Sequence, residues 1–353
     1  MEDAVLGEGG GSVPRPKRRR QAAMADVARL AGVSHQTVSR VINGSERVAP
    51  ETRDRVQEAM RLLDYRPNSV ARALVTGRSR TVGVIGFNTT LFGPASTLFG
   101  IERSAHEADY LTSVVSMPEL NRDSVLLAVE RLRRHNVEGV LALASEKSAL
   151  AALAPVSEEL SLVALEAEPI HGIPTVAIDQ YGGAASATRH LLELGHRRIG
   201  HIGGPAGSLE SQLRLAGCRD TLVDAGCRLP PPEFGDWSAG SGYEICGRLL
   251  AAHPEITAIF AANDQMALGA LRALDEAGRR VPADVSIVGF DAIPESGFFT
   301  PPLTTIHQDF VAIGKLGFEA LRRRIEQGDS SATHRVLESE LLVRASTGPA
   351  PAA

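Results

Sequence analysis

The sequence MADVARLAGVSHQTVSRVIN, residues 24–43, decides the fold of the N-terminal part of the chain. Apolar residues recur at helical spacing as far as Ala31, and Gly32 then supplies a position where no side chain hinders a sharp turn. Ser34 is a favourable N-cap for a second helix that continues to about Ile42. Two short helices joined by a glycine turn predict a helix-turn-helix.

The second of these helices has a polar outer face. Its inner face carries Val38, Val41 and Ile42, which would pack against the first helix. The side chains left outside are His35, Gln36, Ser39 and Arg40. Glutamine can pair with adenine and arginine with guanine in the major groove, so this face is suited to reading DNA bases. The alternative is an ordinary helical hairpin with a solvated polar face.

The charge of the chain is unevenly distributed. Residues 1–80 contain fifteen Lys and Arg against nine Asp and Glu, a balance of +6, whereas the remainder stands at −11. A basic segment on an acidic body favours contact of the N-terminal part with a polyanion. The Gly-, Pro- and Arg-rich residues 1–21 are expected to be disordered, and their run Lys17–Arg20 either contacts DNA or is simply a solvated tail.

The pattern changes from Thr81 onward. Pro50 starts a third predicted helix, Glu51–Leu63, and beyond the polar link at 76–80 short apolar runs alternate with helices. This alternation predicts parallel sheets with helices on both faces. The predicted strands are Thr81–Phe87, Leu111–Ser116, Gly139–Leu143, Leu162–Leu165, Val176–Ile178, Arg198–Ile202, Ala258–Phe260, Ser286–Phe290 and Thr304–Ile306.

Composition disfavours a membrane or secreted protein. The chain of 353 residues has no apolar run of about 18 residues, and its basic N-terminus has no apolar segment behind it. Cys218, Cys227 and Cys246 are odd in number and lack metal-ligand spacing, which is typical of free thiols in a reducing compartment. We therefore expect a cytoplasmic protein.

The sequence offers no enzyme motif. Gly203–Ser208 is glycine-rich but lacks the lysine of a phosphate-binding loop. There is no nucleophile elbow and no spaced set of histidines and cysteines. We expect no catalytic residue, no metal and no cofactor.

The pattern DVA–AGVS–TVSRV–N within residues 24–43 resembles the DNA-binding domain of the LacI/GalR family of transcriptional repressors. The resemblance implies that His35, Gln36 and Arg40 read bases. It places Ser34, Thr37 and Ser39 nearer the phosphates. Residues 65–79, YRPNSVARALVTGRS, resemble the hinge of the same family.

The hinge resemblance implies a short helix that forms when two copies meet on DNA. Asn68 would cap it, and Leu74 would enter the minor groove with Ala71 on the same face. A helix of about seven residues is too short to be stable alone in water. Without the resemblance, Leu74 would be read as an apolar residue in a linker.

The rest of the chain resembles the periplasmic-binding-protein-like core of this family, in which two α/β lobes hold a ligand in the cleft between them. The match is tightest in GDWSAGSGYE, AANDQMALGA, VSIVGFDAIPES and PPLTTIHQDF, which are most similar to the lactose-responsive members. The residues that the resemblance assigns to the ligand are Asn88, Leu91, Arg214, Trp237, Asn263, Asp291, Gln308 and Phe310.

These assignments suit a sugar. Arg214, Asn263 and Asp291 would hydrogen-bond hydroxyl groups, and Trp237 would cover the C–H face of a pyranose. From the first lobe, residues 87–91 would line the cleft, and Glu166 is a further candidate carboxylate. A single Trp is more often a core residue, but its place in GDWSA favours a ligand contact.

The resemblance implies a sequence-specific repressor that binds a palindromic operator in double-stranded DNA, in the nucleoid. Because a hinge helix needs a partner and the chain ends in RASTGPAPAA without a leucine heptad, we expect a homodimer. A small sugar, a β-galactoside or related pyranoside, would release it from DNA. The alternatives are another sugar or metabolite acting as corepressor, and a sugar-binding protein of the cell envelope, which would need a signal peptide and no helix-turn-helix.

The predicted domain organisation follows these motifs. It consists of a disordered basic tail (1–21), a small all-α helix-turn-helix domain (22–66), a hinge helix and linker (67–79), a two-lobed α/β effector-binding and dimerisation domain (80–345) and a disordered tail (346–353).

Overall fold

The computed structural model describes residues 22–352, with the exception of 43, 46, 66–76, 88, 118–120, 144–152, 154 and 158. The chain divides into two compact units, Met1–Arg78 and Ser79–Ala353, here called the N-terminal unit and the core. The predicted tail at 1–21 and the predicted hinge helix lie outside the described residues. Within the described part of the chain, no helix has the length and apolar character needed to cross a membrane.

The N-terminal unit contains three helices, α1 (Met24–Ala31), α2 (His35–Ile42) and α3 (Pro50–Leu62). Val27, Val38 and Val56 are fully buried, one from each helix, and form the centre of the unit. Gly32 ends α1 with φ 65°, a left-handed conformation that glycine adopts without steric cost. The predicted helix-turn-helix is therefore confirmed.

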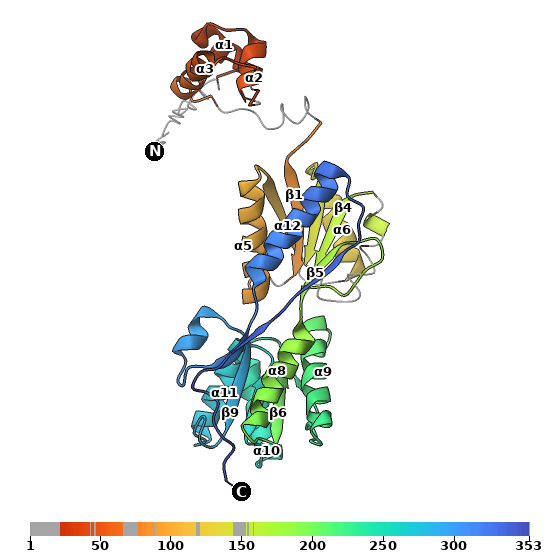
Figure 1. Cartoon of the computed structure of the whole chain (residues 1–353), viewed down its shortest axis with the longest axis vertical. Coiled ribbons are helices and arrows are strands. Elements are labelled where there is room, and N and C mark those ends of the chain that lie inside the picture. The colour runs from red at the N-terminus through yellow and green to blue at the C-terminus, as the bar shows by residue number, and fades with distance from the viewer. Residues whose placement is uncertain are drawn as a thin grey trace, which may run out of the picture. The chain divides into compact units, whose positions relative to one another are not determined.

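The core consists of two sheets, each part of one lobe (Figure 1). In the N lobe the strand order is β11-β5-β4-β3-β1-β2 and all pairings are parallel. These strands are β1 (Thr81–Phe87), β2 (Leu111–Met117), β3 (Gly139–Leu143), β4 (Ser161–Leu165), β5 (Thr175–Ile178) and β11 (His334–Leu337).

In the C lobe the strand order is β12-β10-β9-β8-β6-β7, with only β12 antiparallel to its neighbour in the pairings described. Its strands are β6 (Ile199–Gly203), β7 (Glu233–Phe234), β8 (Ala258–Ala261), β9 (Ser286–Asp291), β10 (Thr304–His307) and β12 (Glu340–Leu342). The predicted α/β fold class is confirmed.

Helices cover both faces of each sheet because successive strand residues point to opposite sides. In the N lobe, Val84 packs toward α5 (Phe92–Glu107) and α12 (Phe310–Gln327), whereas Ile85 packs toward α6 (Arg122–Arg134). In the C lobe, one face is covered by α8 and α9 and the other by α10 and α11. Their bounds are α8 (Gln180–Glu193), α9 (Leu209–Asp224), α10 (Ala239–Ala252) and α11 (Asp264–Glu276), with a 3-10 helix η1 at Pro294–Phe298.

The chain passes between the lobes three times, through short segments at 178–180, 307–310 and 337–340. The N lobe is therefore built from two separate stretches of sequence, one before α8 and one that includes α12 and β11. Figure 1 shows blue C-terminal segments in both lobes, with α12 in the N lobe. The same three segments therefore connect the two lobes.

The C-terminal residues 346–350 pack against the C lobe, although the sequence predicted a disordered tail from residue 346. Ser346 is fully buried and its Oγ donates to the carbonyl oxygen of Ile287 at 2.6 Å. The buried His196 lies with Nε2 3.0 Å from the carbonyl oxygen of Gly348. Small residues that hydrogen-bond rather than pack apolar surface hold this segment, so its composition misled the prediction.

Candidate functional site

A cavity opens between the lobes, where strands of both sheets reach their carboxyl ends. On the N-lobe side, Phe87 ends β1, Leu143 ends β3 and Glu166 follows β4. On the C-lobe side, Asp291 ends β9 and Asn263 follows β8. Parallel strands bring their carboxyl ends to one edge of a sheet, so the two edges face each other across the cavity.

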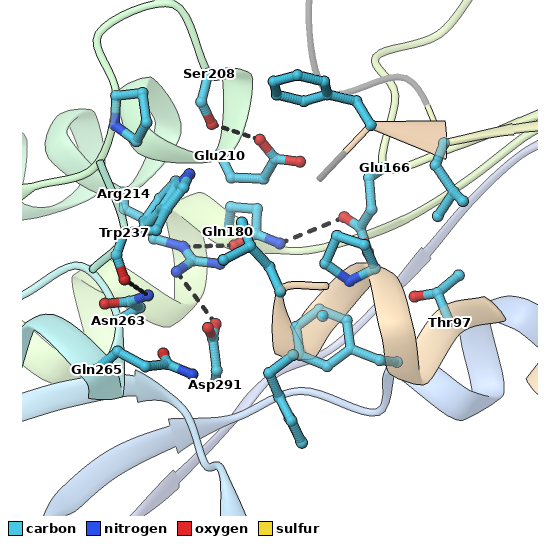
Figure 2. Close-up of a pocket in the computed structure, with 18 residues that line it drawn as sticks. Thr97, Glu166, Gln180, Ser208, Glu210, Arg214, Trp237, Asn263, Gln265 and Asp291 are labelled. Carbon is cyan, nitrogen blue, oxygen red and sulfur yellow. Dashed lines mark hydrogen bonds and ion pairs between the residues drawn. The ribbon is translucent and has the colours of Figure 1, made fainter. Parts of the chain in front are cut away.

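A closed set of polar contacts connects four side chains at this cavity, and Figure 2 draws two of these contacts, from Arg214 to Gln180 and to Asp291. Arg214 Nε donates to Gln180 Oε1 at 2.9 Å, and Gln180 Nε2 donates to Gln308 Oε1 at 2.7 Å. Gln308 Nε2 then donates to Asp291 Oδ1 at 2.7 Å, and the same oxygen lies 3.2 Å from Arg214 Nη1. Gln180 and Gln308 belong to two of the segments that connect the lobes, so the ring links these connections to the C-lobe side chains.

Arg214 is buried and held from several directions. It projects from α9, and its guanidinium carbon lies 4.0 Å from the ring centre of Phe290 and 5.4 Å from that of Trp237. Its Nη1 also donates to the carbonyl oxygen of Ala262. Stacking and hydrogen bonds together fix the plane of the guanidinium, so it is in place before a ligand enters.

Trp237 lines the cavity from the turn between β7 and α10, with φ 71°. Gly204 makes room for its ring, since a Cβ at that position would lie 2.2 Å from the nearest ring atom. Asn263 Nδ2 donates to the Trp237 carbonyl oxygen at 3.0 Å, while its Oδ1 caps α11 by accepting the N–H of Met266 at 2.8 Å. The indole is thus positioned by its backbone together with partial burial of the ring against the C-lobe core.

Three carboxyl groups line the cavity, from Glu166, Glu210 and Asp291. Burial raises the pKa of Asp291 to about 6, against the opposing effect of the nearby Arg214 guanidinium. Burial raises the pKa of Glu166 to about 8, and the charge of Glu210 raises it further. The pKa of Glu210 is itself raised by burial, although Ser208 donates to its Oε2 at 2.6 Å.

Several polar atoms at the cavity have no hydrogen-bond partner among the described residues. They include Thr97 Oγ1, Glu166 Oε1 and Gln265 Oε1. Buried polar atoms without partners are rare in folded proteins because their desolvation is costly. A ligand rich in hydroxyl or amino groups would supply the missing partners.

Residues with strained backbone conformations also line the cavity. Glu166, Trp237 and Asp291 have φ values of 55°, 71° and 99°, a region that side-chain-bearing residues seldom adopt. Such residues are found where the surroundings hold a side chain in a position needed for binding. All three line the cavity.

The N-lobe wall of the cavity is largely apolar. Leu91 and Phe92 lie at the start of α5, and the ring of Phe92 meets that of Phe310 edge to face at 5.9 Å between centres. Gly93 permits this approach, because a Cβ there would lie 2.9 Å from the Phe310 ring. This wall offers a flat apolar contact opposite the polar C-lobe side.

The outer face of α2 presents the polar residues predicted from the sequence. His35, Gln36 and Arg40 are exposed, whereas Val38 is fully buried against the other helices of the unit. The Ser34 Oγ accepts the N–H of Thr37 at 3.1 Å and caps the helix. Ser39 and Thr37 are partly buried.

The structure brings most of the predicted ligand residues together. Leu91, Arg214, Trp237, Asn263, Asp291 and Phe310 line the cavity. Gln308 lies behind the lining and reaches it through Gln180 and Asp291. Asn88, and the hinge residues Asn68, Ala71 and Leu74, lie outside the described residues.

Sequence reasoning missed some residues of the site. Glu210 precedes Arg214 by one helical turn in α9, and this spacing places both on one face, so it could have been found. Gln180 and Gln265 gave no such signal. Within the described residues, no group of three His, Cys, Asp or Glu side chains is arranged to hold a metal ion.

Comparison with known families and proteins agrees with this geometry. Residues 23–68 match the model of the bacterial regulatory proteins of the lacI family, and residues 188–347 match that of the periplasmic binding protein-like domain. The chain is 35% identical over 338 residues to the lactose operon repressor of Klebsiella pneumoniae, an alignment that covers 95% of both proteins.

Other relatives have different names. The chain is 36% identical to the transcriptional regulator CelR of Thermobifida fusca, over 94% of this chain and 99% of CelR. It is 34% identical to the repressor PurR of Haemophilus influenzae strain KW20, over 92% of this chain and 98% of PurR.

Solved structures show the same fold. A lac repressor dimer bound to operator and the anti-inducer ONPF superimposes with a TM-score of 0.85 at 33% identity, covering 93% of this chain and all of that one. A CelR–cellobiose complex gives a TM-score of 0.68 at 33% identity, covering 92% and 99%. The chain therefore belongs to the LacI family, as a DNA-binding transcriptional regulator that responds to a sugar or another metabolite and is not an enzyme.

Proposed function

We propose that this protein is a repressor that binds a palindromic operator as a homodimer and is released from it by a small sugar, a β-galactoside or related pyranoside. The observation that supports this most directly is the cavity itself. Arg214, Asn263 and Asp291 present a guanidinium, an amide and a carboxylate beside the Trp237 ring. This combination suits adjacent hydroxyl groups and the apolar face of a pyranose.

The same cavity suggests how a ligand would act on DNA binding. A sugar in the cavity would contact both lobes. The hydrogen bonds through Gln180 and Gln308 would connect the bound sugar to two of the three segments that join the lobes. Sugar would favour one relative arrangement of the lobes, and only a difference in affinity between two arrangements can shift their populations. A loss of about 100-fold in operator affinity would require roughly 2.7 kcal/mol of coupling.

On the DNA side, we assign base reading to His35, Gln36 and Arg40 and phosphate contacts to Ser34, Thr37 and Ser39. The exposure of the first three and the capped start of α2 support this assignment. We further propose a hinge at 67–79, in which Asn68 caps a helix and Leu74, beside Ala71, enters the minor groove. The protein would act in the cytoplasm, on the nucleoid.

A second candidate is that the ligand is another sugar or a metabolite that promotes DNA binding. It is favoured by the near-equal identity of the chain to the lactose operon repressor, to CelR and to PurR, at 34–36%. The apolar N-lobe wall with Phe92 and Phe310 also differs in character from the polar C-lobe side and would accept a flat apolar group.

The deciding experiment measures binding and release with the full-length chain. An operator is first selected from random duplexes, and its affinity is then measured by fluorescence anisotropy with and without methyl β-D-galactoside, other pyranosides, cellobiose and purine bases. Release by a galactoside supports the proposal, and tighter binding in the presence of a metabolite supports the second candidate. If no pyranoside changes operator affinity or thermal stability, the proposed ligand class is wrong. A stable tetramer in sedimentation at micromolar concentration would contradict the dimer.

A further inference from the structure

The cavity has an unbalanced set of charges. Its lining contains three carboxyl groups, Glu166, Glu210 and Asp291, and among the described lining residues a single basic side chain, Arg214. Asp291 is the carboxylate that pairs with Arg214, at 3.2 Å. Arg214 also donates to Gln180 and to the Ala262 carbonyl oxygen, so its Nε and Nη1 are engaged within the protein.

The remaining two carboxyl groups, of Glu166 and Glu210, come from different lobes. Glu166 follows β4 in the N lobe, and Glu210 lies in the first turn of α9 in the C lobe. Figure 2 shows both side chains reaching into the same cavity. Neither forms an ion pair with a basic residue within the described part of the chain, and the charge of Glu210 raises the pKa of Glu166 beyond the effect of burial.

The N-lobe side of the cavity also contains polar atoms that no protein group satisfies. Glu166 Oε1 has no partner among the described residues, although the carboxyl group is contacted by the backbone N–H of Ile178 and its Oε2 lies 3.4 Å from Gln180 Nε2. Thr97, which is 1% exposed, has an unpartnered Oγ1 at the same cavity. The Thr97 hydroxyl and the Glu166 carboxyl group each keep capacity for a further hydrogen bond.

A donor with a positive charge would satisfy this set better than a neutral one. A metal ion does not fit, because no group of three potential ligands among the described residues is placed to hold one. An alkylammonium group offers three N–H donors and a full charge, and can bond carboxylates on both sides of a cleft at once. Its charge would also favour the ionised form of both carboxyl groups, whose pKa values burial raises in the free protein.

We infer that the natural effector is an amino sugar, a pyranoside whose protonated primary amine lies between Glu166 and Glu210 while its hydroxyl groups meet Arg214, Asn263 and Asp291. This inference rests on the proposed sugar-binding function and refines the class of ligand. It also gives the ligand a direct role in drawing the lobes together, since the ammonium group bridges one carboxylate from each.

The first test is calorimetric titration of the full-length chain with methyl β-D-galactoside, its 2-, 3- and 6-amino-deoxy derivatives, and their N-acetyl forms. We expect at least one amino derivative to bind about 10- to 100-fold more tightly than the parent sugar, the usual effect of a hydrogen bond between charged groups. N-acetylation, which removes the charge, should abolish the gain. Equal or tighter binding of the parent sugar overturns the inference but leaves the proposed sugar-binding function standing.

The second test uses the protons released on binding. At pH 6.5 the amine is already protonated and Glu166, with its pKa raised to about 8, holds a proton in the free protein. Besides Glu166, the groups facing the amine are Glu210, Asp291 and Arg214. Titrations in buffers of different ionisation enthalpy should therefore show release of about one proton with the amino derivative and none with the parent sugar. An absence of proton release with the amino derivative would count against the carboxylate contact.

Variants show whether the charge of the carboxyl groups or the shape of the cavity causes the preference for the amino sugar. Glu210→Gln and Glu166→Gln should each reduce the ratio of the affinity for the amino derivative to that for the parent sugar by tenfold or more. Glu193→Gln, which neutralises an exposed glutamate at the end of α8, is the matched control and should leave both affinities unchanged. A preference that survives both cavity variants overturns the inference. If no pyranoside binds to any form, the proposed function itself fails and the inference with it.

Discussion

Arg214 illustrates how the residues of the cavity are arranged before a ligand is present. Its charge meets Asp291, its plane lies against Phe290 and Trp237, and its Nε is bonded to Gln180. Asp291 Oδ1 already accepts from Gln308 and pairs with Arg214, so the carboxylate is held in place for a ligand hydroxyl. Such pre-positioned groups lose little conformational entropy on binding, which favours affinity.

Loss of the Asp291 carboxylate should therefore weaken sugar binding. We expect Asp291→Asn to lower sugar affinity by at least about 100-fold, because it removes a charged hydrogen-bond acceptor and leaves Arg214 without its partner. Operator affinity without sugar should persist, as anisotropy with labelled operator would show. Asp224→Asn, at the exposed end of α9, is the control. A variant that is still released by sugar at the wild-type concentration would contradict the site.

The position of Trp237 depends on a glycine. Gly204→Ala should displace the indole, since the new methyl would lie 2.2 Å from its ring, and sugar affinity should fall by about tenfold or more. Trp237 is the one tryptophan of the chain, so its fluorescence reports the displacement directly. Gly247→Ala, at a place in α10 with open space around it, should alter neither fluorescence nor affinity. An unchanged emission spectrum in Gly204→Ala would show that the ring is not held as described.

Helix α2 shows what a short element needs in order to present side chains outward. It has eight residues, and Val38 and Val41 hold it against its neighbours while Ser34 caps its start. The side chains that point away from this contact are free to meet another molecule. The helix therefore combines an inner face held by packing with an outer face exposed to solvent.

Arg40 should contribute to the choice of sequence rather than to general attraction. Arg40→Ala should lower affinity for the cognate operator by roughly 1–3 kcal/mol per half-site and relax the base preference at one position. Binding to unrelated DNA should fall much less. Arg61→Ala, which removes an exposed arginine paired with Glu58 on α3, serves as the control. Equal losses on cognate and unrelated DNA would argue against base reading.

The elements differ in how well their sequences predict them. Every strand predicted from an apolar run is present and its ends agree to within one residue, because strands buried on both faces carry a strong apolar signal. β7, β11 and β12 were missed. They are short, none of their residues is fully buried, and all three lie at sheet edges, where pairing depends on the backbone.

The candidate site divides in the same way. Arg214, Trp237 and Asp291 were placed through motifs that resemble a family, and Glu210 could have been found from its helical spacing with Arg214. Gln180 and Thr97 could not, because their roles depend on how two lobes distant in sequence face each other. Contacts across such a cleft leave no local pattern in the sequence.

At the scale of the core, the polar ring joins the ligand side chains to the segments that connect the lobes. Gln180 and Gln308 each lie in such a segment, and they bond to each other at 2.7 Å. The carboxyl groups add a second large-scale property. Several buried acids in one region make the stability of the core depend on pH.

The stability of the ligand-free core should fall as pH rises from 7 to 8.5. The pKa of Glu166, raised to about 8, and that of Asp264, raised to about 7, exceed their unfolded values, so the folded state binds protons that the unfolded state has lost. That stabilising difference disappears as pH passes through the folded pKa values. Calorimetric melting of the core should show a decrease of roughly 2–4 °C.

Histidines do not oppose this trend in the chosen range. Burial lowers the pKa of His201 to about 4 and also lowers that of His196, so both are neutral in the folded state above pH 7 and largely neutral in the unfolded state. Glu166→Gln should flatten the pH dependence, and Glu193→Gln should not. A melting temperature that rises between pH 7 and 8.5 would show that these acids are ionised in the folded core.

The three connections between the lobes have a consequence for recombination and protein engineering. Because the N lobe is assembled from the stretch before α8 and from the stretch carrying α12 and β11, no single cut separates its coding sequence from that of the C lobe. A hybrid that exchanges one lobe with a related regulator needs three junctions, at 178–180, 307–310 and 337–340. One-crossover hybrids would split a lobe, so new effector specificity in such a chain should arise more readily from substitutions around the cavity than from exchange of gene segments.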